Sequence, residues 1–301
     1  QVVPQTDMTF VSGAGTINLA GGVNNGSRSL TLGDANQTGS IFVGGLNVRD
    51  LQIGAGAFDL ELNGSAHIVT STSAPTKFLN TGNLTLYGQG MAFFGGVEAL
   101  GVANTFVAGC VATFGKDISL NNVTMLASSF TNRFDTRWTQ VTPPTSNGAN
   151  ISISNFTSSI SKSVEFDIGA GTPNVVTLSG TTSSTSDLRF RGIGSVNVTG
   201  DASLAGSVRA QNVSFETNTK PSLHFEGNVT LTGAMEFEGI TATFANGVEG
   251  GGNDLTLDFI QTASVDGLAN IANFTSLGGV ELNGSFTTTG FQKYEGDVNL
   301  S

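Results

Sequence analysis

Cysteine and charge are both scarce in this sequence of 301 residues, which has one Cys and 12% charged residues. The single thiol, Cys110, excludes an intrachain disulfide framework, so stability must come from packing and hydrogen bonds. Ordinary soluble domains carry about 25% charged residues. Solubility must therefore come from Asn, Ser, Thr and Gly, a surface composition that suits β-rich extracellular proteins.

Basic residues are also few. Lys and Arg total 12 against 23 Asp and Glu, for a net charge of −11. They form no cluster, so nucleic acid is not expected as a partner, because phosphate binding needs a basic patch. The most apolar window, 90–115, is interrupted by several Gly, by Glu98 and by Asn104. A membrane span is not expected either, and buried strands explain this window better.

Short stretches of alternating apolar and polar residues recur along the whole chain. Leu84-Thr85-Leu86 and Leu255-Thr256-Leu257 are examples, and Gly, Asn or Asp follow such stretches within a few residues. Alternation points successive side chains in and out of a sheet, and these following residues favour tight turns. No stretch has a helical period with capping residues. The pattern predicts an all-β chain of short strands.

Several segments are near-duplicates of one another. NLTLYGQGMAFFGGV at 83–97 resembles NVTLTGAMEFEGI at 228–240, and LELNGS at 60–65 resembles VELNGS at 280–285. LRFRGIGSVNVTG at 188–200 likewise matches LHFEGNVTLTG at 223–233. Degenerate repeats of this kind indicate a solenoid, in which each coil is stable only when stacked on its neighbours.

The predicted fold is therefore a right-handed parallel β-helix with roughly 20 residues per coil and about 15 coils. Six aromatic residues are expected to point into its core: Phe10, Phe58, Phe190, Phe225, Phe237 and Phe244. Cys110, among apolar neighbours, is also expected to be buried. A nucleophilic role for Cys110 would need a base, for which the chain offers only His67 and His224.

Residues 132–150 interrupt the pattern with the only Trp, Trp138, and with Pro143-Pro144. Paired prolines cannot donate ladder hydrogen bonds. We therefore expect solenoid coils over 1–131, an excursion or loop over 132–150, and coils again over 151–301 that continue beyond residue 301. The excursion is either a connecting loop or a binding loop.

The last fifty residues resemble the repeats of filamentous haemagglutinin-like adhesins and giant autotransporter-type proteins. The similarity rests on TFANGVEGGGNDLTLDF at 243–259 and FTSLGGVELNGSFTTTGFQKYEGDVNL at 274–300, including a Thr-Thr-Gly-x-Gln-x-Tyr segment formed by Thr288, Thr289, Gly290, Gln292 and Tyr294. The resemblance implies a β-helix outside the bacterial cell, used as an adhesin shaft or as a self-assembling fibre. Its partners would be other copies or neighbouring repeats, and host or environmental glycans or proteins. It transfers no catalytic residue.

Parallel β-helices also include polysaccharide lyases and hydrolases, whose sites hold carboxylates and basic residues on an outer face. Candidate ligand-binding residues under this alternative come from three similar segments and from the excursion: Arg189, Arg191, His224, Glu226, Glu236, Glu238 and Trp138. Asp187 falls on the same strand face as the two arginines. Opposite charges on stacked strands are equally explained as cross-strand ion pairs. We expect no enzyme activity, catalytic residue, metal or cofactor.

Two further patterns have a structural and a functional interpretation. Gly250 to Leu255 weakly resembles a calcium-binding nonapeptide, but a single copy favours a turn. Asn-x-Ser/Thr triplets are frequent, and stacked turn asparagines explain them better than glycans do. The triplets begin at Asn25, Asn36, Asn63, Asn83, Asn122, Asn150, Asn155, Asn197, Asn212, Asn228, Asn273, Asn283 and Asn299.

Overall fold

The computed structural model describes residues 2, 6–64, 66–137, 147–169, 173–211 and 220–301. These residues form parallel strands and turns, without a helix, stacked as a β-solenoid of about 13 turns spaced ~21 residues apart. The predicted all-β solenoid is confirmed. Fewer coils fit than the expected 15 because some coils contain long connections, such as that between Asp135 and Ile151.

The chain divides into two compact units, Gln1–Ile153 and Ser154–Ser301. The division follows the segment predicted as an excursion. Asn132–Asp135 within that segment form a strand that pairs with the preceding coil. Trp138, Pro143 and Pro144 lie outside the described residues. Nothing in the described part of the chain is a helix long and apolar enough to cross a membrane.

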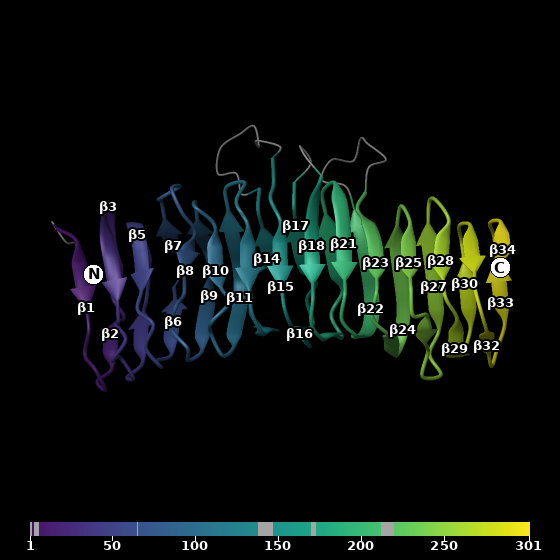
Figure 1. Cartoon of the computed structure of the whole chain (residues 1–301), viewed down its shortest axis with the longest axis horizontal. Helices are drawn as coiled ribbons and strands as arrows, with labels where there is room; N and C mark the ends of the chain where they lie inside the picture. Colours follow the sequence, from purple (N-terminus) through teal and green to yellow (C-terminus); the bar gives the residue numbers. More distant parts are fainter. Residues whose placement is uncertain (1, 3–5, 65, 138–146, 170–172, 212–219) are drawn as a thin grey trace. The chain divides into compact units, whose positions relative to one another are not determined.

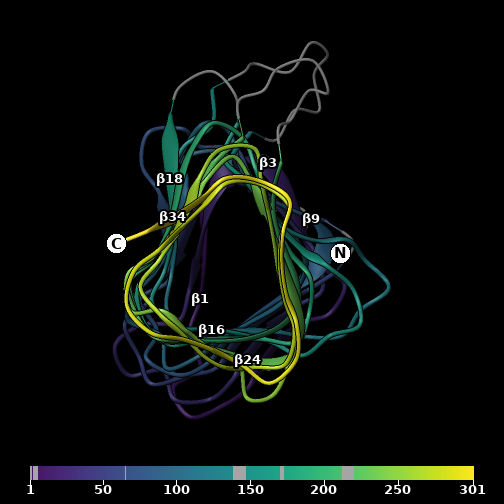
Figure 2. The same cartoon turned by 90° about the vertical axis from the view of Figure 1, so that its right-hand side faces the viewer.

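Each coil has three faces, which we call faces 1, 2 and 3 in chain order. The last coils, yellow in Figure 2, trace a rounded three-sided outline. Every strand pairs in parallel with its equivalents in neighbouring coils, for example β4 with β6 and β10 with β12. Figure 1 shows the strands of each unit lying side by side. Long strands turn a corner and contribute to two faces.

In the N-terminal unit, face 1 consists of β2 (Ile17–Leu19), β4 (Ile41–Val43), β6 (Leu60–Asn63), the first halves of β9 (Leu84–Phe93) and β11 (Thr105–Thr113), and β13 (Val123–Met125). Face 2 consists of the first halves of β3 (Val23–Leu32) and β5 (Leu46–Ile53), β7 (Ala66–Val69), the second halves of β9 and β11, and β14 (Asn132–Asp135). Face 3 consists of β1 (Met8–Phe10), the second halves of β3 and β5, β8 (Thr76–Lys77), β10 (Val97–Ala99), β12 (Ile118–Leu120) and β15 (Ile151–Ile153).

In the C-terminal unit, face 1 consists of β16 (Phe156–Ser158), β19 (Thr182–Ser184), the first halves of β22 (Ala202–Gln211) and β24 (Val229–Gly239), β26 (Val248–Glu249), β29 (Leu268–Ile271) and β32 (Phe286–Thr288). Face 2 consists of β17 (Val164–Asp167), β20 (Leu188–Arg191), the second halves of β22 and β24, β27 (Leu255–Phe259), β30 (Phe274–Ser276) and β33 (Gln292–Tyr294). Face 3 consists of β18 (Asn174–Leu178), β21 (Gly194–Val198), β23 (Ser222–Phe225), β25 (Ala242–Phe244), β28 (Ala263–Val265), β31 (Val280–Leu282) and β34 (Val298–Leu300).

Apolar residues at alternate strand positions form the core, as the sequence predicts. Phe166 stacks on Phe190 with ring centroids 4.9 Å apart, and Phe225 stacks on Phe244 at 5.0 Å. Phe237 meets the latter pair edge-on. Of the six aromatic residues expected inside, five are buried and Phe10, on the first strand, is half-buried.

Cys110 is half-buried, so the expectation of a buried thiol is wrong. It lies on β11 in register with Arg133, whereas its neighbour Val111 points into the core. The pairing of β11 with β9 shifts register between Gly109 and Val111, and Gly109 has a φ of 103°. A bend at Gly109 changes which residues face inward, and that change is not visible in the apolar composition of the segment.

Candidate functional site

A set of charged residues of the C-terminal unit gathers on and beside face 2, where β17, β20, β22 and β24 lie in consecutive coils. Glu165 pairs in register with Arg189, Arg189 with Arg209, and Arg209 with Glu238. We call the following set the charged strip: Glu165, Arg189, Arg191, Arg209, Lys220, Glu236 and Glu238. Parallel register places side chains of neighbouring coils about 4.8 Å apart along the stack.

Ion pairs connect the charged strip from coil to coil. Glu165 forms ion pairs with both Arg189 and Arg191, at 3.9 and 3.4 Å, and the second is also a hydrogen bond. Arg209 contacts Glu236 at 2.9 Å and Glu238 at 3.7 Å, and Lys220 Nζ lies 3.2 Å from Glu238. The side chains of Arg189, Arg191 and Arg209 are between 29% and 39% exposed. Such partly exposed pairs stabilise a fold only modestly.

Arg189 and Arg191 differ from the other basic residues of the strip because two guanidinium groups share one carboxylate. Their Nε atoms, like that of Arg209, are buried and have no hydrogen-bond partner among the described residues. Guanidinium groups bind carboxylate and other oxyanions through paired N–H donors. This end of the strip therefore offers the right chemistry for an acidic group of a ligand.

The structure brings together four of the residues proposed from sequence: Arg189, Arg191, Glu236 and Glu238. The candidates His224 and Glu226 lie apart from these four residues. His224 lies on β23 of face 3, between Asn197 and Thr243, and its ring nitrogen Nε2 is 3.2 Å from the Ser222 hydroxyl. Glu226 is exposed at the end of the same strand.

Asp187 is half-buried like the two arginines, as expected of the same strand face, and accepts a hydrogen bond from the Ser207 backbone N–H. Trp138 lies outside the described residues. Among the described contacts, Asp187 forms no ion pair with the charged strip.

Sequence reasoning missed three members of the strip: Glu165, Arg209 and Lys220. The first two lie on alternating segments, VEF and VRA, that look like any other solenoid strand. They can be aligned with Arg189 only if the number of residues in each coil is known, and that number varies along the chain. Lys220 comes from a connection between faces and carries no strand pattern.

A second ordered set of polar groups follows the corner from face 3 to face 1. There, a turn Asp or Asn side-chain oxygen in one coil accepts a hydrogen bond from the backbone N–H of the next coil. Asp59 Oδ1 is 2.7 Å from Asn83 N, Asp201 Oδ1 is 2.9 Å from Asn228 N, and Asn155 Oδ1 is 2.9 Å from Thr181 N. Amide side chains extend the ladder, as where Asn104 donates to Asn83. We call this set the Asp/Asn ladder.

This arrangement bears on the Asn-x-Ser/Thr triplets. Asn83, Asn155 and Asn228 each begin one and take part in the Asp/Asn ladder. All three lie at turns as expected, but among the described contacts the one to another turn asparagine is that of Asn83 with Asn104, whereas Asn155 contacts Thr181 and Asn228 contacts Asp201. Whether any triplet carries a glycan stays a prediction.

The Gly-rich segment before Leu255 forms a turn between β26 and β27. Asn253 donates to Gly250 and Leu231 carbonyls, and Asp254 accepts from both the backbone and side chain of Asn273. Asp254 therefore links one coil to the next. The described residues hold no group of three or more His, Cys, Asp or Glu side chains that could bind a metal.

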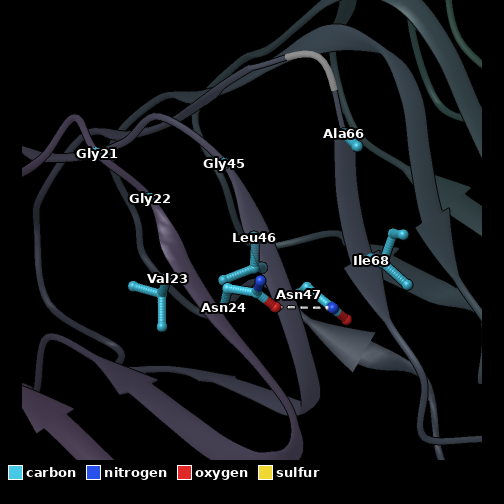
Figure 3. Close-up of a pocket in the computed structure, with 9 residues that line it drawn as sticks. All are labelled: Gly21, Gly22, Val23, Asn24, Gly45, Leu46, Asn47, Ala66 and Ile68. Carbon is cyan, nitrogen blue, oxygen red and sulfur yellow. Dashed lines mark hydrogen bonds between the residues drawn. The ribbon is translucent and has the colours of Figure 1, made fainter. Parts of the chain in front are cut away.

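A shallow hollow of about 290 Å³ lies on face 2 of the N-terminal unit, over β3, β5 and β7 (Figure 3). Gly21, Gly22 and Gly45 form one rim, and Ala66 and Ile68 form the other. Its polar side chains, Asn24 and Asn47, hydrogen-bond to each other at 2.9 Å. No charged side chain lines the hollow, and the amides of Asn24 and Asn47 already use part of their hydrogen-bonding capacity on each other.

No protein-family model, curated protein or solved structure matches this chain. The adhesin resemblance of the last fifty residues therefore has no support from a named relative. The architecture supports the coarser class: the chain is a β-helix repeat protein.

Proposed function

We propose that this chain is a structural segment of a secreted or surface-exposed bacterial adhesin of the filamentous haemagglutinin-like type. In this role the coils form a shaft or fibre that holds adhesive parts away from the cell or associates with other copies. Polar contacts that connect one coil to the next carry the proposal. The Asp/Asn ladder and the charged strip both use their side chains to link neighbouring coils, which supports a structural role.

Electron microscopy and sedimentation of the purified chain over a concentration series test this function. A shaft or fibre segment should give elongated particles with a high frictional ratio, and self-association should lengthen them as concentration rises. Compact particles with the frictional ratio of a globular protein would contradict the proposal. An intact-cell adhesion assay with the gene deleted would then test the surface role.

A second candidate is binding or cleavage of an acidic polysaccharide at the charged strip. The sharing of Glu165 by Arg189 and Arg191 favours it, because a ligand carboxylate could take the place of one ion pair. A glycan array tests binding, with R189Q/R191Q as the variant and K293Q, also on face 2, as the control. No signal on acidic glycans, or equal signals from all three proteins, would reject this candidate.

Cleavage is tested separately with E236Q/E238Q. If the two carboxylates act on a glycosidic bond, the double substitution should abolish product formation. No activity in the unsubstituted chain, or the same activity in the variant as in the unsubstituted chain, would reject catalysis by these two carboxylates.

A further inference from the structure

His67 lies inside the N-terminal unit, although the unit's other ionisable residues near it face outward. The side chain is on β7, fully buried, in an interior column between Leu46 of β5 and Met91 of β9. Neither ring nitrogen has a hydrogen-bond partner among the described residues. A buried polar group without a partner destabilises a fold by about 1–3 kcal/mol, so a merely structural role would be better filled by an apolar residue.

The charged groups around His67 do not compensate a positive charge on it. β9 carries no charged residue, and Arg49 and Asp50 on β5 pair with each other at the surface. Lys77 on β8 pairs with Glu98 on β10, and Glu61 on β6 accepts from Asn63. No carboxylate of these strands therefore points inward to hold an imidazolium.

Burial lowers the pKa of His67 from 6.5 to about 4, with desolvation as its only cause. The unfolded chain binds a proton near pH 6.5, whereas the folded chain binds one only near pH 4. Stability from this residue is therefore fully present above pH 6.5 and is lost as the pH falls toward 4. Asp50 acts in a different window: the hydrogen bond from Arg49 lowers its pKa below 3.8, so its contribution is lost only in stronger acid.

We propose that His67 is an acid-sensitive lock, whose protonation opens the coils of the N-terminal unit around β7. A charged imidazole cannot remain between Leu46 and Met91 without a partner, so the local strands must separate to hydrate it. Opening would expose the edges of β5 and β9 on face 2. The device would make this region of the chain respond to acidification while leaving the C-terminal unit folded.

Hydrogen exchange measured by mass spectrometry on the full chain tests the lock, at pH 7 and at pH 4.5 with intrinsic rates corrected. Wild type should lose protection over residues 46–93 at the lower pH, and peptides of the C-terminal unit should keep theirs. H67M, which matches the neighbouring Met91 in volume, should keep protection at both pH values. H224Q removes the only other histidine, on an outer face, and should behave as wild type.

Denaturant unfolding gives the expected size of the effect. Between pH 6.5 and 4 the unfolding equilibrium constant of wild type should rise about tenfold per pH unit from His67 alone, or roughly 300-fold in total. The H67M variant should lack this component. Equal pH dependence in wild type and H67M would overturn the lock.

The chain's two histidines also permit a test that does not depend on the folding of a variant at position 67. In NMR spectra of wild type, the imidazole absent from H224Q spectra identifies His224, and the other resonance is His67. We expect His67 to stay neutral down to about pH 5. Titration of His67 near pH 6.5 in the folded chain would overturn the proposal.

Discussion

The corner from face 1 to face 2 is built differently in the two units. In the N-terminal unit, glycines stack there in consecutive coils: Gly44, Gly64, Gly88 and Gly109. A Cβ at any of them would meet the carbonyl oxygen of the coil before it, well inside van der Waals contact. In this unit the turn is tight because the backbones of successive coils touch.

The first two coils of the C-terminal unit instead have buried hydroxyl groups at this corner, whereas later coils have glycines there, such as Gly206 and Gly251. Ser158 and Ser186 hydroxyls are 2.8 Å apart, Ser186 donates to the Ile160 carbonyl at 2.7 Å, and Ser184 donates to the Ser186 carbonyl at 2.9 Å. These side chains satisfy turn carbonyls that would otherwise be buried without a donor. The comparison teaches that one corner of a solenoid can be made either by removing side chains or by filling the turn with small hydrogen-bonded ones.

The largest effect should come from breaking the glycine corner. Gly109→Ala places a Cβ against the Gly88 carbonyl and imposes a φ of 103° on a residue with a side chain. Strain and overpacking together should lower the free energy of unfolding by about 4 kcal/mol in urea denaturation. Gly101→Ala, where a Cβ meets nothing within 4 Å, is the control and should change it little. Similar losses in both variants would contradict the close-packed corner.

A substitution in the serine corner should lower the free energy of unfolding by a smaller amount. Ser186→Ala leaves the Ile160 carbonyl and the Ser158 hydroxyl without this partner, so we expect a loss of about 2 kcal/mol in urea denaturation. The control Ser183→Ala, at a half-buried outward position on β19, should stay within about 0.5 kcal/mol of wild type. If Ser186→Ala were neutral, the hydroxyl network would not hold this corner.

Unlike the corner from face 1 to face 2, the corner from face 3 to face 1 contains the Asp/Asn ladder in both units. Asp201→Ala removes an acceptor for the Asn228 backbone and side-chain amides and should lower stability by about 1 kcal/mol. Asp59→Ala in the other unit should cost a similar amount. Asp201→Asn keeps an acceptor and should recover most of the loss in thermal denaturation. If Asp201→Asn lost as much stability as Asp201→Ala, the negative charge of Asp201 rather than its role as an acceptor would be responsible.

The smallest effect is expected in the charged strip. Arg209→Gln removes the ion pairs to Glu236 and Glu238, which are partly exposed, and should lower the free energy of unfolding by less than about 1 kcal/mol. Because salt screens such pairs, the difference from wild type should shrink further in 1 M NaCl, about a 3 Å screening length. A larger, salt-independent loss would mean that Arg209 acts through packing.

The charged strip itself could be predicted only in part from the sequence. Arg189, Arg191, Glu236 and Glu238 show strand alternation, which places each of them on an outer surface. Alternation does not indicate which of the three faces a residue occupies, so the sequence groups His224 with these residues although it lies on face 3. Arg209 and Glu165 became visible only once the register between coils was known.

By itself, the sequence determined the all-β class, the solenoid and the inward direction of most core aromatic residues, because these follow from a two-residue period and from repetition. Only the tertiary structure decided which face each strand occupies. The first four residues of LELNGS form β6 on face 1 of their unit, whereas the first three of the nearly identical VELNGS form β31 on face 3 of the other.

The physical reason is that in-and-out alternation is local, whereas the face is set by turn geometry and by pairing with residues about 21 positions away. The same non-local packing placed Cys110 outward and His67 inside the core.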